Sequence, residues 1–331
     1  MILADSMIRA YMESGLIKIE PRPNELQPAS IDLRLGKIFE LESVKYPNLE
    51  NLVKNNDNGF SEYVKAIDKL EEKIEIKYRE LPFESDDSIL LRKGKLYFFE
   101  TLERLCISDK VDEIFLASKS SLARLLVDLI PLGKEVMYKE KTPFSGKIFG
   151  NLISRVFDIK LYKNQKIMQC IFIEGSPTHI SEIHVGDGFL KPVDGGTIDV
   201  RHLDNEIYEK LKDDHILLHH FTPGNEFFLA ISNEDVDFSS AENAGIILPY
   251  HSMKRTCIAP FIDPGYKGKI TLTLIGGAIP KIIKKGDGIA DMLVHKMKGK
   301  VLRPYGHQEL GSKYQGITEI NGIRAKSMTG N

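Results

Sequence analysis

Two short segments carry side chains that could bind and activate a phosphorylated ligand. The first, Ser118–Arg124, reads Ser-Lys-Ser-Ser-Leu-Ala-Arg, a pattern that predicts a strand running into the start of a helix. Two hydroxyls, the free N–H groups of a helix start and an arginine one turn later suit a phosphate chain. The same residues are typical of an ordinary helix cap followed by a surface arginine, so the pattern alone supports both interpretations.

The second segment, Phe261–Ile270, predicts a tight turn that leads into a strand. Asp263 would sit in the turn with its carboxylate held by local N–H groups, and such a carboxylate could orient or deprotonate a water molecule. Tyr266 could stack beneath a sugar or a base. By composition alone, however, Asp-Pro-Gly is simply favourable turn chemistry, and an ordinary turn is the better explanation.

The carboxyl-terminal segment is a third candidate. Residues 303–316 are rich in Gly, Lys, Tyr and Gln, a composition that suits a flexible arm closing over a ligand. A frayed and solvated end explains the same composition equally well.

Composition excludes several classes of function. The 331 residues carry a net charge of −2, so no global basic excess is present to hold a nucleic acid by its phosphates. No apolar run reaches the length of about 18 residues that a membrane span needs, and the first residues lack a signal-peptide layout. Three cysteines far apart in sequence rule out a disulfide framework and indicate a reducing cytoplasm. The histidines have no ligand partners at metal-site spacing, so we expect no metal site. From the cysteine usage we expect a cytoplasmic protein.

Short apolar runs predict a mainly β protein. Separated by Gly, Pro and charged turns, they follow one another from about residue 95 onward, which is typical of a β-sandwich or a barrel. A short helix is predicted over 4–16. The strongest helical periodicity, at residues 60–75, predicts a surface-packed helix in an insertion at about 50–80. At roughly 100–200 residues per domain, the length suggests two domains.

An internal repeat divides the chain into two halves. Ser30–Arg34 recurs as Thr197–Arg201, and Phe144–Ile148 recurs as Tyr266–Ile270, in the same order in both halves. Two looser echoes keep that order: Phe98-Phe99 with Phe227-Phe228, and Ser120–Arg124 with His251–Arg255. We therefore predict one β unit at 1–178, which contains the helical insertion, and a second at 179–331, which ends in the closing tail.

Together, these segments resemble the motifs of the dCTP deaminase/dUTPase superfamily. Gln27–Gly36 looks like the opening of a dCTP deaminase, and Ser118–Arg124 looks like the second motif of the family. Further matches are Ile262–Ile270 with the third motif, Tyr162–Gln169 with the fourth, and Arg303–Tyr305 and Ser312–Gly316 with the deaminase carboxyl terminus. The layout is most similar to the long, duplicated bacterial form of dCTP deaminase.

The resemblance implies two tandem dUTPase-like units, each a distorted β-barrel or jelly roll. It also implies a homo-oligomer, a trimer in the family, with sites between subunits. The family deaminase removes the 4-amino group of dCTP without zinc and yields dUTP and ammonia, while Mg²⁺ is carried on the triphosphate. The implied partner is therefore a deoxynucleoside triphosphate, dCTP or dUTP.

The resemblance also assigns roles to particular residues. Ser120, Arg124 and Asp263 would be catalytic, with Ser120, Ser121 and Arg124 holding phosphate and the surroundings of the catalytic water. Asp263 and Tyr266 would contact the deoxyribose. The nucleotide-binding set that the resemblance implies is Lys119, Ser121, Asp263, Tyr266, Tyr305, Lys313, Tyr314 and Gln315.

One position departs from the family pattern. The family deaminase uses a glutamate, five residues after the glycine of the third motif, as its general acid and base. That position is Asn151 when counted from Gly146 and Thr273 when counted from Gly268. Neither side chain can shuttle a proton at neutral pH.

Three functions follow from these residues. The first is a dCTP deaminase-like hydrolase of pyrimidine deoxynucleotide metabolism, in which Glu135 or Glu140 could replace the missing glutamate. The second is a dUTPase-like diphosphohydrolase, in which Asp263 activates the water that attacks phosphorus and pyrophosphate leaves from dUTP. The third is a catalytically inactive deoxynucleotide-binding protein. Ammonia release separates the first from the other two, and pyrophosphate release separates the second from the third.

Overall fold

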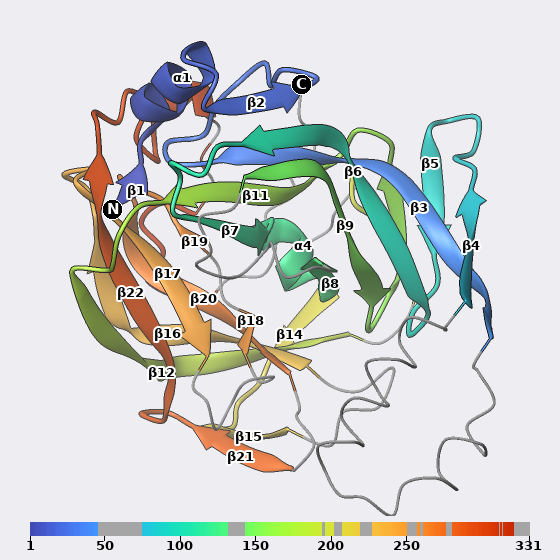
Figure 1. Ribbon diagram of the computed structural model, residues 1–331. Helices are drawn as coiled ribbons and strands as arrows, with labels where there is room; N and C mark the ends of the chain where they lie inside the picture. The colour runs from blue at the N-terminus through green and yellow to red at the C-terminus, as the bar shows by residue number, and fades with distance from the viewer. Residues whose placement is uncertain are drawn as a thin grey trace, which may run out of the picture.

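The computed structural model describes residues 1–45, 75–131, 143–193, 196–201, 207–218, 227–249, 257–258, 261–275, 280–310, 312 and 314–320. These residues form a mainly β protein, as the apolar runs predicted (Figure 1). The helix predicted at 60–75 lies almost wholly outside the described residues. Among the described residues, no helix has both the length and the apolar character that crossing a membrane requires.

Strands dominate both halves of the chain. The elements of the first half are β1 (Ile2–Leu3), α1 (Asp5–Glu13), β2 (Ile17–Glu20), β3 (Ile31–Lys45), β4 (Glu75–Leu81), β5 (Ser88–Leu91), β6 (Leu96–Ile107), β7 (Glu113–Ser118), α4 (Ser120–Arg124), β8 (Val127–Pro131), β9 (Phe144–Ser154), β10 (Asp158–Tyr162) and β11 (Lys166–Ile173). Those of the second half are β12 (His179–Pro192), β13 (Thr197–Asp199), β14 (Tyr208–Lys210), β15 (His215–Leu218), β16 (Phe227–Asp237), β17 (Asn243–Pro249), β18 (Cys257–Ile258), β19 (Phe261–Ile262), β20 (Lys267–Ile275), β21 (Lys281–Lys284), β22 (Gly288–Lys298) and a 3₁₀ turn at Gln308–Leu310.

The same strand pairings occur in both halves. In the first half, β6 lies between β3 and β9, and β11 pairs with β3 and β7. In the second half, β16 lies between β12 and β20, and β22 pairs with β12 and β17. All of these pairings are antiparallel. The predicted duplication is therefore present as two sets of strands with matching neighbours.

Hydrogen bonds at the start of each set fix how the two halves correspond. In the first half, the backbone N–H and the Nε of Arg34 both donate to the Glu103 carboxylate, at 2.7 and 2.6 Å. In the second half, the backbone N–H of His184 donates to the Glu234 carboxylate, and the His184 ring nitrogen Nδ1 lies 2.8 Å from its other oxygen. Two residues before each glutamate stands a hydroxyl, that of Thr101 or Ser232, which donates to the backbone carbonyl oxygen of the glutamate. The same hydroxyl accepts a hydrogen bond from a backbone N–H, that of Ile148 or Ile270.

This correspondence corrects one part of the predicted repeat. The counterpart of β3 is β12, whereas Thr197–Arg201 contains β13, a short strand that pairs parallel with β10 in a separate three-stranded sheet. The residue types of Ser30–Arg34 recur in Thr197–Arg201, but the strand pairing of β3 and the hydrogen bonds that Arg34 makes to Glu103 do not. The second repeat, Phe144–Ile148 with Tyr266–Ile270, is confirmed because Gly146 and Gly268 occupy matching register positions.

Two glycines at matching positions allow neighbouring strands to approach closely. A Cβ added at Gly36 would lie 2.8 Å from the backbone nitrogen of Leu102, and one added at Gly186 would lie 2.6 Å from the carbonyl oxygen of Ser232. Both contacts are with backbone, which cannot swing aside as a side chain can. These glycines are therefore required by packing.

The two halves share one apolar core. Phe99, Phe157 and Phe172 of the first half and Phe189 and Phe227 of the second are buried in the same hydrophobic cluster. The amino-terminal strand β1 joins the halves, because it pairs with β11 on one side and with β22 on the other. The division into units at 1–178 and 179–331 stays a prediction.

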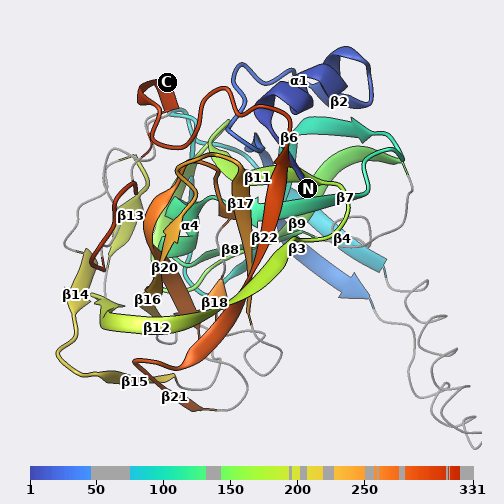
Figure 2. The same ribbon diagram turned by 90° about the vertical axis from the view of Figure 1, so that its left-hand side faces the viewer.

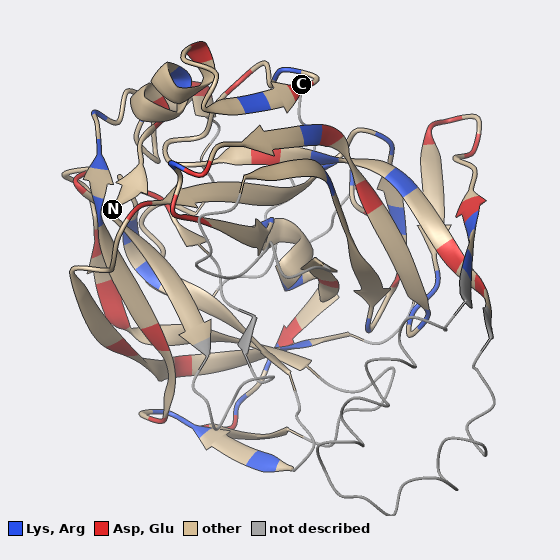
Figure 3. Ribbon diagram, in the orientation of Figure 1, with Lys and Arg blue, Asp and Glu red and all other residues tan. Residues whose placement is uncertain are grey.

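The helix α4 lies near the middle of the molecule in both ribbon views (Figures 1 and 2). First-half strands β3, β6 and β9 lie on one side of it, and second-half strands β12, β16 and β20 lie on the other. Positive and negative residues are interspersed along the described strands (Figure 3), in line with the small net charge of the chain.

The close approach at Gly186 predicts a sharp difference between two glycine substitutions. We expect Gly186→Ala to lower the free energy of unfolding by about 1–3 kcal/mol, because the strands must move apart. Gly146 is the matched control, since a Cβ there meets only the Phe144 ring at 3.6 Å, an ordinary contact. Urea unfolding of both variants measures the difference, and equal stability would contradict the packing argument.

Candidate functional site

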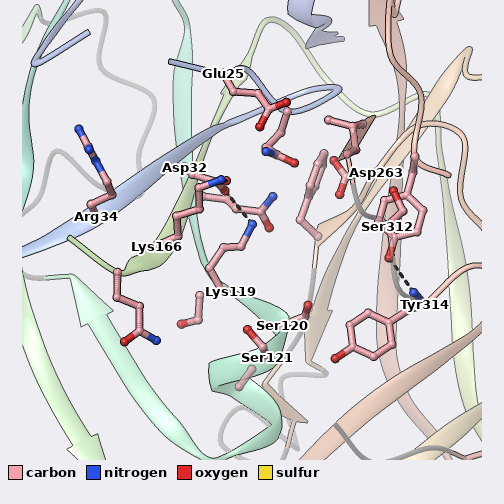
Figure 4. Close-up of a pocket in the computed structure, with 18 of the residues that line it drawn as sticks. Glu25, Asp32, Arg34, Lys119, Ser120, Ser121, Lys166, Asp263, Ser312 and Tyr314 are labelled. Carbon is pink, nitrogen blue, oxygen red and sulfur yellow. Dashed lines mark hydrogen bonds and ion pairs between the residues drawn. The ribbon is translucent and has the colours of Figure 1, made fainter. Parts of the chain in front are cut away.

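A cavity of about 960 Å³ opens between the two halves around α4. From the first half it is lined by Asp32, Lys119, Ser120, Ser121, Arg124 and Lys166, among others. From the second half it is lined by Asp263, Tyr266, Thr271, Thr273, Tyr305 and Tyr314, among others. Figure 4 shows several of these side chains converging on the cavity from strands, from α4, from the turn at Asp263 and from the tail.

The structure brings together most of the residues singled out from the sequence. Lys119, Ser120, Ser121 and Arg124 come from the predicted strand-to-helix segment, which the structure confirms as β7 followed by α4. Across the cavity stand Asp263, Tyr266, Thr273, Tyr305 and Tyr314.

The remaining sequence-derived residues lie away from the cavity or cannot be placed. Gln315 is not among the residues that line the cavity; its side chain instead accepts a hydrogen bond from Lys267 N and donates one to Gly265 O, which holds the tail. Asn151 lies on β9, away from the cavity lining, opposite Ile130. Lys313 falls outside the described residues, as do Glu135 and Glu140, the two candidates for replacing the family glutamate.

Two lysines neutralise a buried carboxylate on the first-half wall. Lys119 Nζ lies 2.7 Å from Asp32 Oδ1, and Lys166 Nζ lies 3.2 Å from Asp32 Oδ2. Burial by itself would raise the pKa of Asp32, but the charges of the two lysines outweigh it and hold that pKa below its usual value. Asp32 is therefore ionised at neutral pH, and its charge is matched by the lysines.

On the opposite wall, the carboxyl group of Asp263 has a raised pKa, in contrast to that of Asp32. Burial raises the pKa of its carboxyl group to about 7; Lys119 opposes the rise and the negative charge of Asp32 adds to it. Its Oδ1 is buried and has no hydrogen-bond partner among the described residues. The expected turn is present, with Gly265 at φ +95°. The turn N–H groups do not hold Oδ1, however, contrary to the sequence-based expectation.

The tyrosines of the second half form one side of the cavity. The Tyr266 hydroxyl donates to the carbonyl oxygen of Lys269, and its ring packs edge-on against Tyr305, with ring centres 5.6 Å apart. The Tyr314 ring lies under the Arg124 guanidinium, 4.0 Å from its carbon. Arg124 is thus stacked on an aromatic ring at the cavity wall, and its predicted role as a phosphate clamp stays a prediction.

The carboxyl-terminal tail packs beside β20 at Gly316 and Ile317. Gly316 N donates to Lys267 O and Lys269 N donates to Ile317 O, each at 2.8 Å. Tyr314 N donates to the Tyr305 hydroxyl at 3.1 Å. The described part of the tail therefore borders the cavity and is not a solvated end.

Sequence reasoning does not find Thr271 and Asp32 as site residues. Thr271 and Thr273 alternate with Ile270, Leu272 and Leu274 on β20, and both threonines line the cavity. Polar residues at every second position of an apolar strand are the signal that could have revealed them. In the sequence, Asp32 is only part of a repeated strand, because nothing local indicates its lysine partners.

Unpaired polar atoms mark the cavity as a ligand site. Among the described residues, Asp263 Oδ1, Thr271 Oγ1 and Tyr314 Oη are buried without a hydrogen-bond partner, and all three residues line this cavity. Buried polar groups are nearly always paired in folded proteins, so three orphans on one wall indicate a polar ligand. No group of three or more His, Cys, Asp or Glu side chains within the described chain could hold a metal ion.

Comparison with known proteins gives consistent results. A family model described as dCTP deaminase-like matches residues 2–175. A dCTP deaminase, dUMP-forming, from Thermobifida fusca is 30% identical over 181 residues, covering 54% of this chain and 80% of that protein. The protein of the same name from Acidothermus cellulolyticus is 30% identical over 181 residues, covering 54% and 82%.

A solved structure extends the likeness to the second half. The crystal structure of a 2′-deoxycytidine 5′-triphosphate deaminase from Agrobacterium tumefaciens superposes with a TM-score of 0.66. The match covers 90% of this chain and 99% of that one, at 19% sequence identity. At this identity the likeness shows the fold alone, and it does so across both sets of strands.

The unpaired hydroxyl of Thr271 predicts an unusual response to mutation. We expect Thr271→Val to leave the free energy of unfolding unchanged or to raise it, because the substitution removes a buried polar atom that lacks a partner. Thr101→Val is the matched control: its hydroxyl bonds Glu103 O and Ile148 N, so its loss should cost about 1–3 kcal/mol. Chemical denaturation of both variants without ligand tests this, and similar losses in the two would contradict it.

The buried carboxyl of Asp263 predicts a pH dependence of stability. Its pKa is about 7 in the folded protein and near 3.8 in the unfolded chain, so the folded state binds the proton more tightly. The contribution of Asp263 to the stability of the wild type should therefore fall as pH rises between these values. Asp263→Asn cannot ionise, so its stability relative to wild type should increase from pH 5 to pH 8, by at most about 3 kcal/mol, because about two pH units of that interval lie below the folded-state pKa. Unfolding curves at both pH values measure this, and a constant difference would show that the pKa is not raised.

Proposed function

The chain belongs to the dCTP deaminase-like family, and from that premise we propose that it hydrolyses dCTP in the cavity between its two halves. The family resemblance in the sequence implies dUTP and ammonia as products. Because the curated relatives carry the name dUMP-forming, we extend the proposal to a second hydrolysis. In balanced form, dCTP and water give dUTP and ammonia, and dUTP and water give dUMP and pyrophosphate.

The observation that carries the proposal is the unpartnered carboxyl of Asp263 in a cavity that also holds Lys119, Ser120 and Ser121. A group with a pKa of about 7 can accept a proton from water and return it at neutral pH. The lysine and the two hydroxyls have the chemistry to bind phosphate oxygens. Mg²⁺ would enter as part of the nucleotide substrate.

A second candidate function is favoured by Thr273. This residue stands at the family glutamate position, and its hydroxyl lies 3.5 Å from the carbonyl oxygen of Ala123. A threonine cannot relay protons to a leaving ammonia. Hydrolysis of the phosphate chain alone needs a base that deprotonates water and charged side chains that bind the phosphates. It does not need a glutamate at the position of Thr273. The alternative is therefore a diphosphohydrolase that releases pyrophosphate from dUTP, with Asp263 as its base.

The deciding experiment follows ammonia and pyrophosphate separately. Purified protein is incubated with Mg²⁺ and either dCTP or dUTP, and the nucleotide products are separated by chromatography. Ammonia from dCTP supports deamination. Pyrophosphate from dUTP without ammonia from dCTP supports the second candidate. If neither product forms although the nucleotide raises the melting temperature, the protein is an inactive binder and both proposals fail.

Asp263→Asn tests the role of the carboxyl group. We expect turnover to fall by about 10²- to 10⁴-fold, the usual contribution of a general base. The wild-type rate should rise as pH passes about 7 and level off above it, since the ionised carboxylate accepts the proton. Asp187→Asn, at an exposed residue paired with Lys285 outside the cavity, is the control. An unchanged rate in Asp263→Asn would remove this residue from the mechanism.

A further inference from the structure

We infer that one chain forms one complete nucleotide site by itself, with the first half supplying the phosphate-binding wall and the second half supplying the acid–base wall. The inference rests on the proposed function for the identity of the ligand. It differs from the expectation, drawn from the family resemblance, that sites form between subunits.

Contacts between the halves hold the two walls together within the chain. The Thr273 hydroxyl on β20 donates to Ala123 O on α4 at 3.5 Å. The Tyr208 hydroxyl on β14 donates to the carbonyl oxygen of Arg124. The Arg124 guanidinium lies over the Tyr314 ring, 4.0 Å from its centre. The segment proposed to bind phosphate is therefore anchored by second-half residues of the same chain.

The tail that borders the cavity also belongs to the same chain. Arg303 Nη1 pairs with Glu25 at 2.8 Å, and its Nη2 donates to Leu26 O at 2.9 Å, so the tail is fixed to the first half. Leu302 N donates to the buried carboxylate of Asp5 at 2.9 Å. Further along, Tyr305 N donates to Pro264 O at 2.8 Å. The tail thus spans from one wall to the other without a partner chain.

The sequence of the first half lacks a counterpart of Asp263. Asp263 stands five residues before Gly268, and Lys141 stands five residues before the corresponding Gly146. The carboxyl group of Asp263 therefore has no counterpart at the matching sequence position. At the position matching Thr273, Asn151 Oδ1 is buried without a hydrogen-bond partner among the described residues. The number of nucleotides bound per chain therefore decides between one site and two.

Stoichiometry is the first test. Light scattering after size exclusion gives the mass of the particle, and titration calorimetry with Mg²⁺–dCTP gives the number of nucleotides bound per chain of 37.4 kDa. We expect one nucleotide per chain, whatever the oligomeric state. Two per chain, or fewer than one per fully folded chain, would overturn the inference.

Mixing of two variants tests whether the two walls belong to the same chain. Ser120→Asp places a negative charge on the phosphate wall, and Asp263→Ala removes the carboxyl from the opposite wall. The two proteins are mixed in equal amounts, unfolded and refolded together so that subunits exchange. If each site lies within one chain, the mixture binds no better than the separate variants. If sites form between chains, about a quarter of them regain two intact walls, and the tight binding that returns would overturn the inference.

Controls separate this inference from the proposed function. As a control, the variant that carries both Ser120→Asp and Asp263→Ala is refolded with wild type. Nucleotide binding in this mixture shows that mixing alone does not destroy intact sites. Wild-type protein that binds no Mg²⁺–dCTP or Mg²⁺–dUTP defeats both the proposed function and the inference. One nucleotide per chain without turnover, and with no binding restored in the mixture, defeats the proposed function and supports the inference. Turnover together with restored binding in the mixture supports the function and defeats the inference.

Discussion

The ion pair between Lys119 and Asp32 supplies the two charges that act on Asp263 in the cavity. Lys119 is the positive group that acts on Asp263, but Asp32 accepts its hydrogen bond at 2.7 Å and offsets its charge. Asp263 therefore faces a nearly neutral pair, and burial decides its protonation. If Asp32 were absent, Lys119 would be free to stabilise an ionised Asp263, and the cavity would lose its group that titrates near neutral pH.

Duplication explains how one chain can hold two such different walls. Both halves keep the same support: a glutamate that binds the start of a strand, a hydroxyl two residues earlier, and a glycine that allows close approach. Because this support is common to both, the loops and strands that it carries can differ without altering the scaffold. The Ser-Ser-Arg segment is described in the first half and the Asp-Pro-Gly turn in the second, and α4 packs against β20 where they meet.

The sequence predicted those features that depend on local pattern. The strand running into α4, the turn at Asp263 and the mainly β class follow from residues close together in the chain. The sequence misled where residue types recur without the contacts of the strand. Thr197–Arg201 resembles Ser30–Arg34 in sequence, but it forms β13, which pairs with β10. The close glycine contact and the glutamate partner seen in β3 recur in β12. The sequence could not reveal the pKa of Asp263, because that depends on burial and on two side chains more than 140 residues away in the sequence.

The replacement of the family glutamate by Thr273 limits what the cavity can do. On the first-half wall, Asp32 is held ionised by two lysines and cannot donate a proton at neutral pH. Glu103 is bound by the backbone and side chain of Arg34, so its carboxylate serves the scaffold. Among the described residues that line the cavity, Asp263 combines an unpartnered oxygen with a pKa of about 7. A reaction that releases ammonia needs a proton delivered to the leaving group as well as one removed from water, whereas cleavage of a phosphoanhydride needs only the removal. If Asp263 can perform both transfers in turn, it takes over the role of the missing glutamate. If it reaches only the attacking water, the same cavity is restricted to releasing pyrophosphate.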